Sequence, residues 1–485
     1  MLHLKSISRV ISILLIIVCL FMILPSILAL YYGEMKALQA FILTLTITSA
    51  VCGTYVLLTR NHKKSTFTIK DGFLFVSLSW VCVSLIGSLP AYISGIIPSF
   101  TDSFFETMSG ITTTGSTILT NIEVLPKSIL FWRALTHWLG GMGIVVLTVA
   151  VFPILGIGGL ELIKAEVPGP NVDKLTPRIT GTAKILWFIY IGFTVLETIL
   201  LMFGGMTWFD ALTQSFATIS TGGLSTKNAS IGFFNSAYID WVVMVFMFLS
   251  GINFALHFRL ISGKSLIVLR DTELKVYISI LVISTLLIAF NLYESNIYSS
   301  IEECLRYAGF HVTSIMTTTG FSSVNYESWP YFSQIILFTM LFVGACSGST
   351  GGGIKVIRLV TLFKQALNEM KLLLHPRGVF VLKLNGKAIE KNIVYAIAGF
   401  FFLYMTIVLI ITVIIASSGE DIFTSFTAAL ATLGCVGPAF GKVGPHANYA
   451  FFEDYVKWTL SVAMLIGRLE LYTILILFTP GFWRK

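Results

Sequence analysis

Charged side chains are scarce in this 485-residue chain: Asp, Glu, Lys and Arg make up 12% of its residues, whereas hydrophobic residues make up 55%. Soluble domains typically carry about twice that share of charge, so this composition excludes a soluble globular protein. Several apolar stretches exceed the roughly 20 residues that a helix needs to cross the hydrocarbon core of a bilayer. The sequence therefore predicts an all-α polytopic membrane protein.

Cysteine clusters and catalytic motifs are also missing. The six cysteines are scattered and show no CxxC or CxxH spacing, so they indicate neither a disulfide framework nor a zinc site. Neither an HExxH motif nor a pair of intramembrane aspartates occurs. These absences predict that the protein is not an enzyme and that it holds no covalently bound cofactor.

Hydropathy predicts ten membrane-spanning helices. Their expected ranges are 5–31, 36–60, 71–96, 126–155, 181–206, 234–260, 274–294, 331–365, 391–418 and 455–480. The first run follows Lys5 and Arg9 as a signal peptide would, but it continues past Leu30 with no clear small-x-small cleavage site. We interpret it as a retained helix.

Basic residues gather in alternate connections and at both ends of the chain, and the positive-inside rule places these regions in the cytoplasm. The basic connections lie at 60–70, 164–184, 259–275 and 355–391. The opposite side carries acids, namely Asp102, Glu106, Asp210, Glu302, Glu303, Asp421, Glu453 and Asp454. We predict a multi-pass protein of the bacterial inner membrane with both termini cytoplasmic, and the net charge of +8 then requires no nucleic-acid partner.

Four shorter segments with polar tips lie between consecutive spans and are too short to cross a bilayer. They superpose at 109–115, 216–222, 314–320 and 428–434, and each ends in glycine. The chain is thus interpreted as an N-terminal helix pair followed by four units of helix, half-helix, glycine loop and helix. The expected ranges are 1–68 for the pair and 69–165, 166–265, 266–388 and 389–485 for the units.

Such loops have a physical use in a membrane. Irregular backbone at membrane depth is tolerated only where it is buried in protein or lines a water-filled cavity. Four loops converging on one axis would build a pore, and their carbonyl oxygens would replace the hydration shell of a cation. Glycine allows positive φ, and half-helices whose C-terminal ends point inward favour cations. The alternative is that the threonine-rich tips are ordinary polar loops.

Several motifs add a family resemblance that covers essentially the whole chain. Besides the four loops, these are RALTHWLGGMG at 133–143, CSGSTGGGIK at 346–355 and GRLEL at 467–471. With them the sequence resembles the TrkH branch of the TrkH/KtrB/fungal Trk superfamily of potassium transporters. The resemblance implies a potassium-channel-like pore with four non-identical repeats in a pseudo-fourfold arrangement. It also implies a homodimer and a cytosolic TrkA-type regulatory subunit, which alone would bind nucleotide, ATP/ADP or NAD.

The superposition and the resemblance together place a K+ selectivity filter in the four loops. The expected filter residues are Thr113, Thr114, Gly115, Thr221, Gly222, Thr319, Gly320, Leu433 and Gly434. The expected K+ ligands are the backbone carbonyls of Thr113, Thr114, Thr221, Thr319 and Gly434. The fourth loop departs from the others, because Leu433 stands where they have threonine. One glycine per repeat, without a TVGYG run, predicts weaker discrimination against Na+ than in tetrameric potassium channels.

The eighth span is interrupted by a glycine-rich stretch that should not hold a regular helix. We predict a gate formed by Cys346, Ser347, Gly348, Ser349, Thr350, Gly351, Gly352 and Gly353, together with Arg468. A structural bend is one alternative. A phosphate-binding loop is another, but the required Gly-Lys-Ser/Thr ending is absent.

Arg468 lies in the middle of an apolar span, where an unpaired charge is costly and usually faces a pathway or a partner. It is expected to hold the glycine-rich loop or to place a positive charge below the filter; the alternative is a buried ion pair with another helix. Glu470 lies on a different face of the same helix. His137 is interpreted as a packing residue, and Gly140, Gly141 and Gly143 as sites of close helix contact.

Two transport mechanisms remain open at this point. A gated potassium pore is favoured, and a K+ symporter coupled to H+ or Na+ is the alternative. A symporter needs an intramembrane group that changes protonation, for which Glu470 is the clearest acid in the sequence. The basic stretch 355–391 is expected to contact the regulatory subunit or anionic lipid headgroups.

Overall fold

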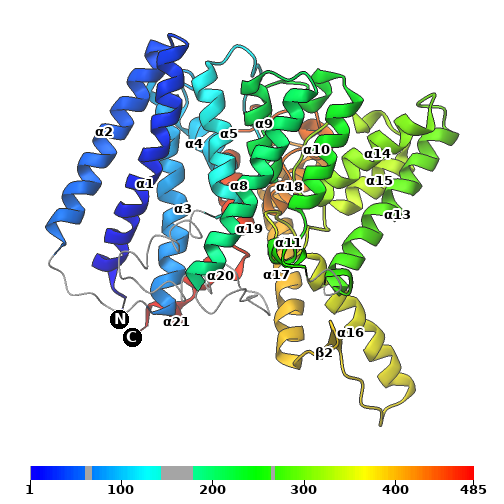
Figure 1. The fold of residues 1–485 in the computed structure, drawn as a ribbon. Coiled ribbons are helices and arrows are strands. Elements are labelled where there is room, and N and C mark those ends of the chain that lie inside the picture. The colour runs from blue at the N-terminus through cyan, green and yellow to red at the C-terminus, as the bar shows by residue number, and fades with distance from the viewer. Residues whose placement is uncertain (1, 61–67, 144–178, 264–267, 485) are drawn as a thin grey trace.

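The computed structural model describes residues 2–60, 68–143, 179–263 and 268–484. These residues are almost entirely helical, as expected (Figure 1). Within the described ranges the strands are β1 (Lys383–Leu384) and β2 (Lys387–Ala388), an antiparallel hairpin with Lys383 opposite Ala388. The second half of the predicted fourth span and the predicted boundaries 165/166 and 265/266 lie outside the described residues.

The N-terminal helices α1 (Leu4–Tyr31) and α2 (Met35–Leu58) pack against each other and against α3 (Ile69–Ile93). In α1 the buried residues include Ile7, Leu14 and Met22, whereas Leu20 and Ile27 are exposed. Exposed leucine and isoleucine on a long helix suit a lipid-facing surface, because hydrocarbon solvates them as well as a protein core does.

The remaining helices follow in the order long helix, short helix, helix. The long helices are α3, α8 (Ile179–Phe203), α13 (Thr272–Glu294) and α17 (Lys391–Ala416). The short helices are α4 (Phe100–Ile111), α9 (Trp208–Ile219), α14 (Ile301–Met316) and α18 (Ile422–Gly434). The helices that follow them are α5 (Lys127–Gly141), α10 (Ala237–Ser250), α15 (Tyr331–Met340) and α19 (Asp454–Arg468). Short elements complete the chain: η1 (Ser230–Phe234), η2 (Tyr326–Ser328), η3 (Gly441–Val443) and α21 (Pro480–Trp483).

The four short helices begin in the same way. An N-cap side chain accepts a hydrogen bond from the backbone N–H three residues later in each of them, at Ser99, Thr207, Ser300 and Asp421. Such caps satisfy one of the free N–H groups at a helix start and fix where the helix begins. The short helices occupy one half of the bundle, whereas both chain termini, α16 (Val356–Leu374) and the hairpin lie toward the other end (Figure 1).

Six described helices are long and apolar enough to span a membrane, or up to eight if two bent pairs are counted as spans. The predictions of a continuous helix at 234–260 and at 455–480 were wrong. The chain bends by 97° between α10 and α11 (Phe254–Ile261), and by 111° between α19 and the segment formed by α20 (Tyr472–Leu475) and η4 (Ile476–Phe478). The predicted interruption of 331–365 is confirmed, since α15 ends at Met340 and α16 begins at Val356. We call the non-helical segment between them the 341–355 loop.

Candidate functional site

The four short helices end in loops with one shared backbone conformation. The first left-handed residue is Thr113 (φ 54°), Thr221 (54°), Thr318 (61°) or Cys435 (54°). Two residues later stands a glycine with positive φ, namely Gly115 (84°), Gly223 (77°), Gly320 (78°) or Gly437 (88°). The residue between them donates its N–H five residues back in every loop: Thr114 to Ser109, Gly222 to Ala217, Thr319 to Ser314 and Val436 to Ala431, at 2.8–2.9 Å.

This geometry corrects the superposition in two loops. Gly223 and Gly437 occupy the positions of Gly115 and Gly320, where the sequence comparison had placed Gly222 and Gly434. Leu433 and Gly434 are the last two residues of α18 and lie before the loop. In the second loop, the adjacent Gly222 and Gly223 leave the alignment ambiguous by one residue. In the fourth loop, Thr432-Leu433-Gly434 resembles the Thr-Thr-Gly of other loops, although these residues are helical.

The four loops contact one another in a closed cycle. A Cβ atom on Gly115 would lie within 3.0 Å of the carbonyl oxygen of Gly222. A Cβ atom would clash in the same way on Gly223 with the Thr319 carbonyl, on Gly320 with the Val436 carbonyl and on Gly437 with the Thr114 carbonyl. Each glycine therefore admits the carbonyl of another loop against its Cα, and each also has the positive φ that side chains disfavour. We call these four glycines with the four carbonyls the glycine ring.

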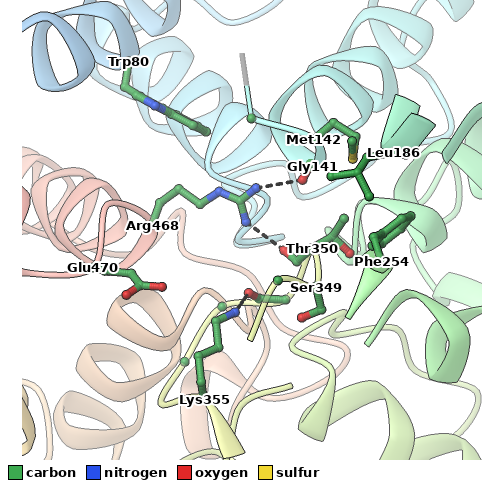
Figure 2. A pocket seen from close by; sticks show the side chains of 16 residues that line it. Trp80, Gly141, Met142, Leu186, Phe254, Ser349, Thr350, Lys355, Arg468 and Glu470 are labelled. Carbon is green, nitrogen blue, oxygen red and sulfur yellow. Dashed lines mark hydrogen bonds between the residues drawn. The ribbon is translucent and has the colours of Figure 1, made fainter. Parts of the chain in front are cut away.

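Cavities lie next to the glycine ring and next to the 341–355 loop. One, of about 60 Å³, is lined by Gly115, Gly223, Gly320 and Pro438 among others. The other, of about 200 Å³, is lined by residues 348–353, Lys355, Arg468 and Glu470 together with Trp80 and Phe254 (Figure 2).

The tip of the 341–355 loop contacts the residues that precede the glycine ring. Thr350 Oγ1 lies 3.3 Å from Thr221 Oγ1, and the Gly352 N–H donates to Thr318 Oγ1 at 2.7 Å. A Cβ on Gly352 would also lie within 3.0 Å of the Cys435 Cβ. The loop tip therefore lies directly against three of the four left-handed residues.

Arg468 contacts Thr113, the fourth of these left-handed residues. Its Nη1 donates to Thr113 Oγ1 at 3.0 Å and to the Thr350 carbonyl at 2.8 Å, and its Nη2 donates to the Gly140 carbonyl at 2.6 Å. Figure 2 shows its side chain pointing at Thr350 and toward the end of α5. The guanidinium thus ties the loop tip to α5, which agrees with the expected loop-holding position. Two residues further along the chain, Glu470 forms an ion pair with Arg358 of α16.

The break between α10 and α11 provides backbone groups that bind the 341–355 loop. The Cys346 N–H donates to the Gly251 carbonyl at 3.0 Å, and the Phe254 N–H donates to the Gly348 carbonyl at 3.0 Å. A continuous helix would use these backbone groups internally, so the bend exposes them to the 341–355 loop. The adjacent Gly251 and Asn253 were the sequence signal for this break, and hydropathy alone did not detect it.

Several packing predictions can be judged directly. His137 is fully buried, and its imidazole lies against Gly222, where an added Cβ would clash. Gly140 and Gly141 are sites of close contact, because a Cβ would lie within 3.0 Å of the Ile111 carbonyl and of Ser220, respectively. The interpretation of Gly140 and Gly141 as sites of close contact is confirmed, and His137 is a buried residue packed against Gly222.

A buried ion pair that hydropathy and motifs did not predict braces the first two loops. Arg133 Nε lies 2.5 Å from Glu106 Oε1, with both side chains at most 7% exposed. Glu106 also accepts from the Ile118 N–H at 2.9 Å, and Arg133 Nη1 donates to the Ser225 carbonyl at 2.7 Å. The pair therefore connects the chain that follows Gly115 to the chain that follows Gly223.

We expect Glu106→Ala to lower the free energy of unfolding by about 3–5 kcal/mol, because it leaves the Arg133 charge buried without its carboxylate. The measurement is denaturant unfolding of the purified protein in detergent. Glu420→Gln is the matched control, since Glu420 pairs with Lys442, whose side chain is 59% exposed, and this change should leave the unfolding midpoint in place. Equal effects of the two changes would contradict the bracing role.

Comparisons with known proteins agree over the whole chain. Residues 37–485 match the family described as TrkH, cation transport protein. The chain is 42% identical over 491 residues to the Trk system potassium uptake protein TrkH of Escherichia coli K12, covering 100% of both chains. It is also 42% identical to TrkH of Salmonella typhimurium over 487 residues, again covering both completely. The crystal structure of the potassium transporter TrkH from Vibrio parahaemolyticus superposes with a TM-score of 0.88 at 38% identity over 100% of each chain.

Proposed function

The chain belongs to the TrkH family of cation transport proteins, and we propose from this that it takes up K+ across the bacterial inner membrane through a gated pore with a backbone-carbonyl filter. It is a multi-pass membrane transport protein and not an enzyme. The observation that carries the pore proposal is the glycine ring, in which four loops from four parts of the chain meet in a closed cycle.

The filter is assigned to the glycine ring and the residues beside it. Thr113, Thr114, Gly115, Thr221, Gly222, Thr319 and Gly320 are proposed in the expected role. Gly223 joins Gly222 in the second loop. In the fourth loop Gly437 takes the place expected for Gly434, so Leu433 and Gly434, which end α18, are left out. Carbonyls of the loops would replace the hydration shell of K+. The C-terminal ends of the four short helices lead into these loops, and their partial negative charge favours a cation. The four units then form a pseudo-fourfold arrangement around the pore.

The 341–355 loop is assigned as the gate, with Arg468 as its latch. Support comes from its tip, which lies against Thr221, Thr318 and Cys435, so a cation leaving the glycine ring on that side would meet the loop. The backbone of the loop bonds to the bend at 251–254, an arrangement that differs from a continuous helix. Conduction would require the tip to move away.

The charge pattern and the family suggest the orientation of the protein in the membrane and its partners. Both termini and the basic α16 region would face the cytoplasm, where positive residues are retained. Homodimerisation and a cytosolic TrkA-type subunit that carries the nucleotide remain proposals from the resemblance. Anionic lipid headgroups are proposed to contact the same basic face.

An ion-coupled symporter is the second candidate, and one observation favours it. Glu197 of α8 is fully buried in a candidate membrane span, beside Thr218 of α9. An intramembrane carboxyl of this kind is a functional candidate by default. Glu470, the clearest acidic candidate in the sequence, is paired with Arg358.

Potassium flux into proteoliposomes separates the two candidates. We expect flux that follows the K+ gradient alone, with no dependence on an imposed pH or Na+ gradient, because a passive pore has no coupled ion. Glu197→Gln, which keeps the shape of the side chain and cannot release a proton, should leave this behaviour unchanged. Strict dependence on a pH gradient that disappears in Glu197→Gln would instead establish the symporter.

A further inference from the structure

Both ends of the 341–355 loop converge on one side chain. Glu273 Oε1 accepts the Ser347 N–H at 2.7 Å and the Ile357 N–H at 3.1 Å. Glu273 lies in the first turn of α13 and is 8% exposed. A single carboxylate oxygen therefore joins the segment entering the loop tip to the first turn of α16 that leaves it.

Backbone hydrogen bonds also hold the two ends of the 341–355 loop close together. The Gly344 N–H donates to the Ile354 carbonyl at 2.9 Å, and the Val356 N–H donates to the Ala345 carbonyl at 3.3 Å. The segments that enter and leave the loop thus run side by side toward the tip at Thr350–Gly352. Hydrogen bonds from backbone N–H groups to a carboxylate are stronger than those between neutral groups. Glu273 consequently holds the base of the loop, while Arg468 holds its tip.

The first turn of α13 is in turn tied to the β-hairpin. Asn385, at the turn of the hairpin, donates from Nδ2 to Asp271 Oδ2 at 2.8 Å and accepts the Thr272 N–H at 2.7 Å. On the other side, Lys364 Nζ of α16 donates to the Lys383 carbonyl at 3.1 Å. The hairpin therefore bridges the helix that carries Glu273 and the helix that leaves the loop.

We propose that Glu273 is the positioning residue that keeps the 341–355 loop beneath the glycine ring, and that the 383–388 hairpin sets its position through Asn385. This inference rests on the proposed gate function of the loop. Asn385, Gly386 and Lys387 are exposed, so a force or a partner acting on the hairpin reaches the loop base through two hydrogen-bonded steps. Glu273 bonds to Ser347 and Ile357, and Asn385 bonds to Asp271 and Thr272, all of which lie outside the glycine ring.

The test combines hydrogen exchange with flux on the full-length protein. Glu273→Ala removes the acceptor, whereas Glu273→Gln keeps an amide oxygen at the same place. We expect the Ser347 and Ile357 amides to exchange about tenfold faster in Glu273→Ala, as loss of a charged hydrogen bond implies, and near the wild-type rate in Glu273→Gln. K+ flux should rise roughly several-fold in Glu273→Ala, because the same lost hydrogen bonds no longer hold the loop in place. The K+ over Na+ selectivity should stay unchanged. Glu294→Gln, at the exposed far end of α13, is the matched control.

Asn385→Ala keeps the proposal testable if Glu273→Ala does not fold, because Asn385 is exposed. The same two amides should then exchange roughly threefold faster, since neutral hydrogen bonds are weaker. Unchanged exchange of these amides in folded Glu273→Ala and in Asn385→Ala, or a loss of selectivity alongside faster flux, would overturn the proposal. Exchange that responds as expected while no variant conducts K+ would overturn the pore function and leave the role of Glu273 in holding the loop base intact.

Discussion

Replacing Gly437 with alanine is expected to abolish selective K+ transport. Gly437 has φ of 88°, and a Cβ there would lie within 3.0 Å of both the Thr114 carbonyl oxygen and the Gly115 carbonyl carbon. Alanine is disfavoured by this backbone conformation, and the clash is with backbone that cannot swing aside. The glycine ring would have to open between the fourth and first loops, so we expect K+ over Na+ selectivity to fall at least about tenfold, the change that 1.4 kcal/mol of lost discrimination produces. Reversal potentials under mixed K+ and Na+ gradients measure this.

Gly434→Ala is the matched control, and it separates the register seen in the structure from the one the sequence suggested. An added Cβ at Gly434 meets its nearest atom, the Tyr404 hydroxyl, at 3.4 Å, an ordinary contact distance. Gly434 also lies at the end of α18, where alanine is a good helix former. Selective transport should therefore survive. If Gly434→Ala lost selectivity while Gly437→Ala kept it, the assignment of the fourth filter position would be refuted.

Arg468→Gln is expected to raise K+ flux about tenfold or more while leaving ion selectivity unchanged. Arginine donates simultaneously to Thr350 in the loop and to Gly140 at the end of α5, and glutamine is too short to maintain both contacts. Each lost charged hydrogen bond is worth about 1.5–3 kcal/mol, which shifts the loop toward positions away from the glycine ring. Flux into proteoliposomes at a fixed protein density is the measurement.

Arg468→Lys distinguishes a latch from an electrostatic barrier. Lysine keeps the positive charge but lacks the planar fork that reaches several acceptors at once. We expect flux in Arg468→Lys to rise toward the level of Arg468→Gln. Flux that stays at the wild-type level in Arg468→Lys and rises only in Arg468→Gln would show that charge, and not the hydrogen bonds to the loop, restricts conduction.

Hydropathy and charge were sufficient for the general architecture. Long apolar runs must be satisfied by lipid or by other helices, so the predicted spans correspond to α1, α2, α3, α8, α13 and α17 within a few residues at each end. The short helices were predictable because their caps and acids are local signals at Ser99, Thr207, Ser300 and Asp421. The glycine-rich interruption of the eighth span was also predictable, because glycine lowers the stability of a helix wherever it is placed.

The bend at 469–471 had no such local signal, whereas Gly251 and Asn253 marked the bend between α10 and α11. At 469–471 the chain turns by 111° through Glu470 (φ 55°) and Leu471 (φ 49°), neither of which is a glycine or proline. Such strained residues persist only where surrounding contacts hold them, and here Glu470 is held by Arg358 of α16. The bend is therefore a property of the assembled bundle.

The sequence by itself determined that this is a helical membrane protein, that four glycine loops recur between its spans and that residues 346–353 interrupt a helix. The tertiary structure alone decided which glycines are equivalent, since Gly223 and Gly437 were identified by their positive φ and by the carbonyls packed against them. It alone also brought Glu273 to the base of the 341–355 loop, and it identified Thr350 as the residue of that loop whose carbonyl Arg468 binds. The physical reason is that patterns of hydropathy and glycine reflect local conformation, whereas these contacts join residues that are 74 or more positions apart.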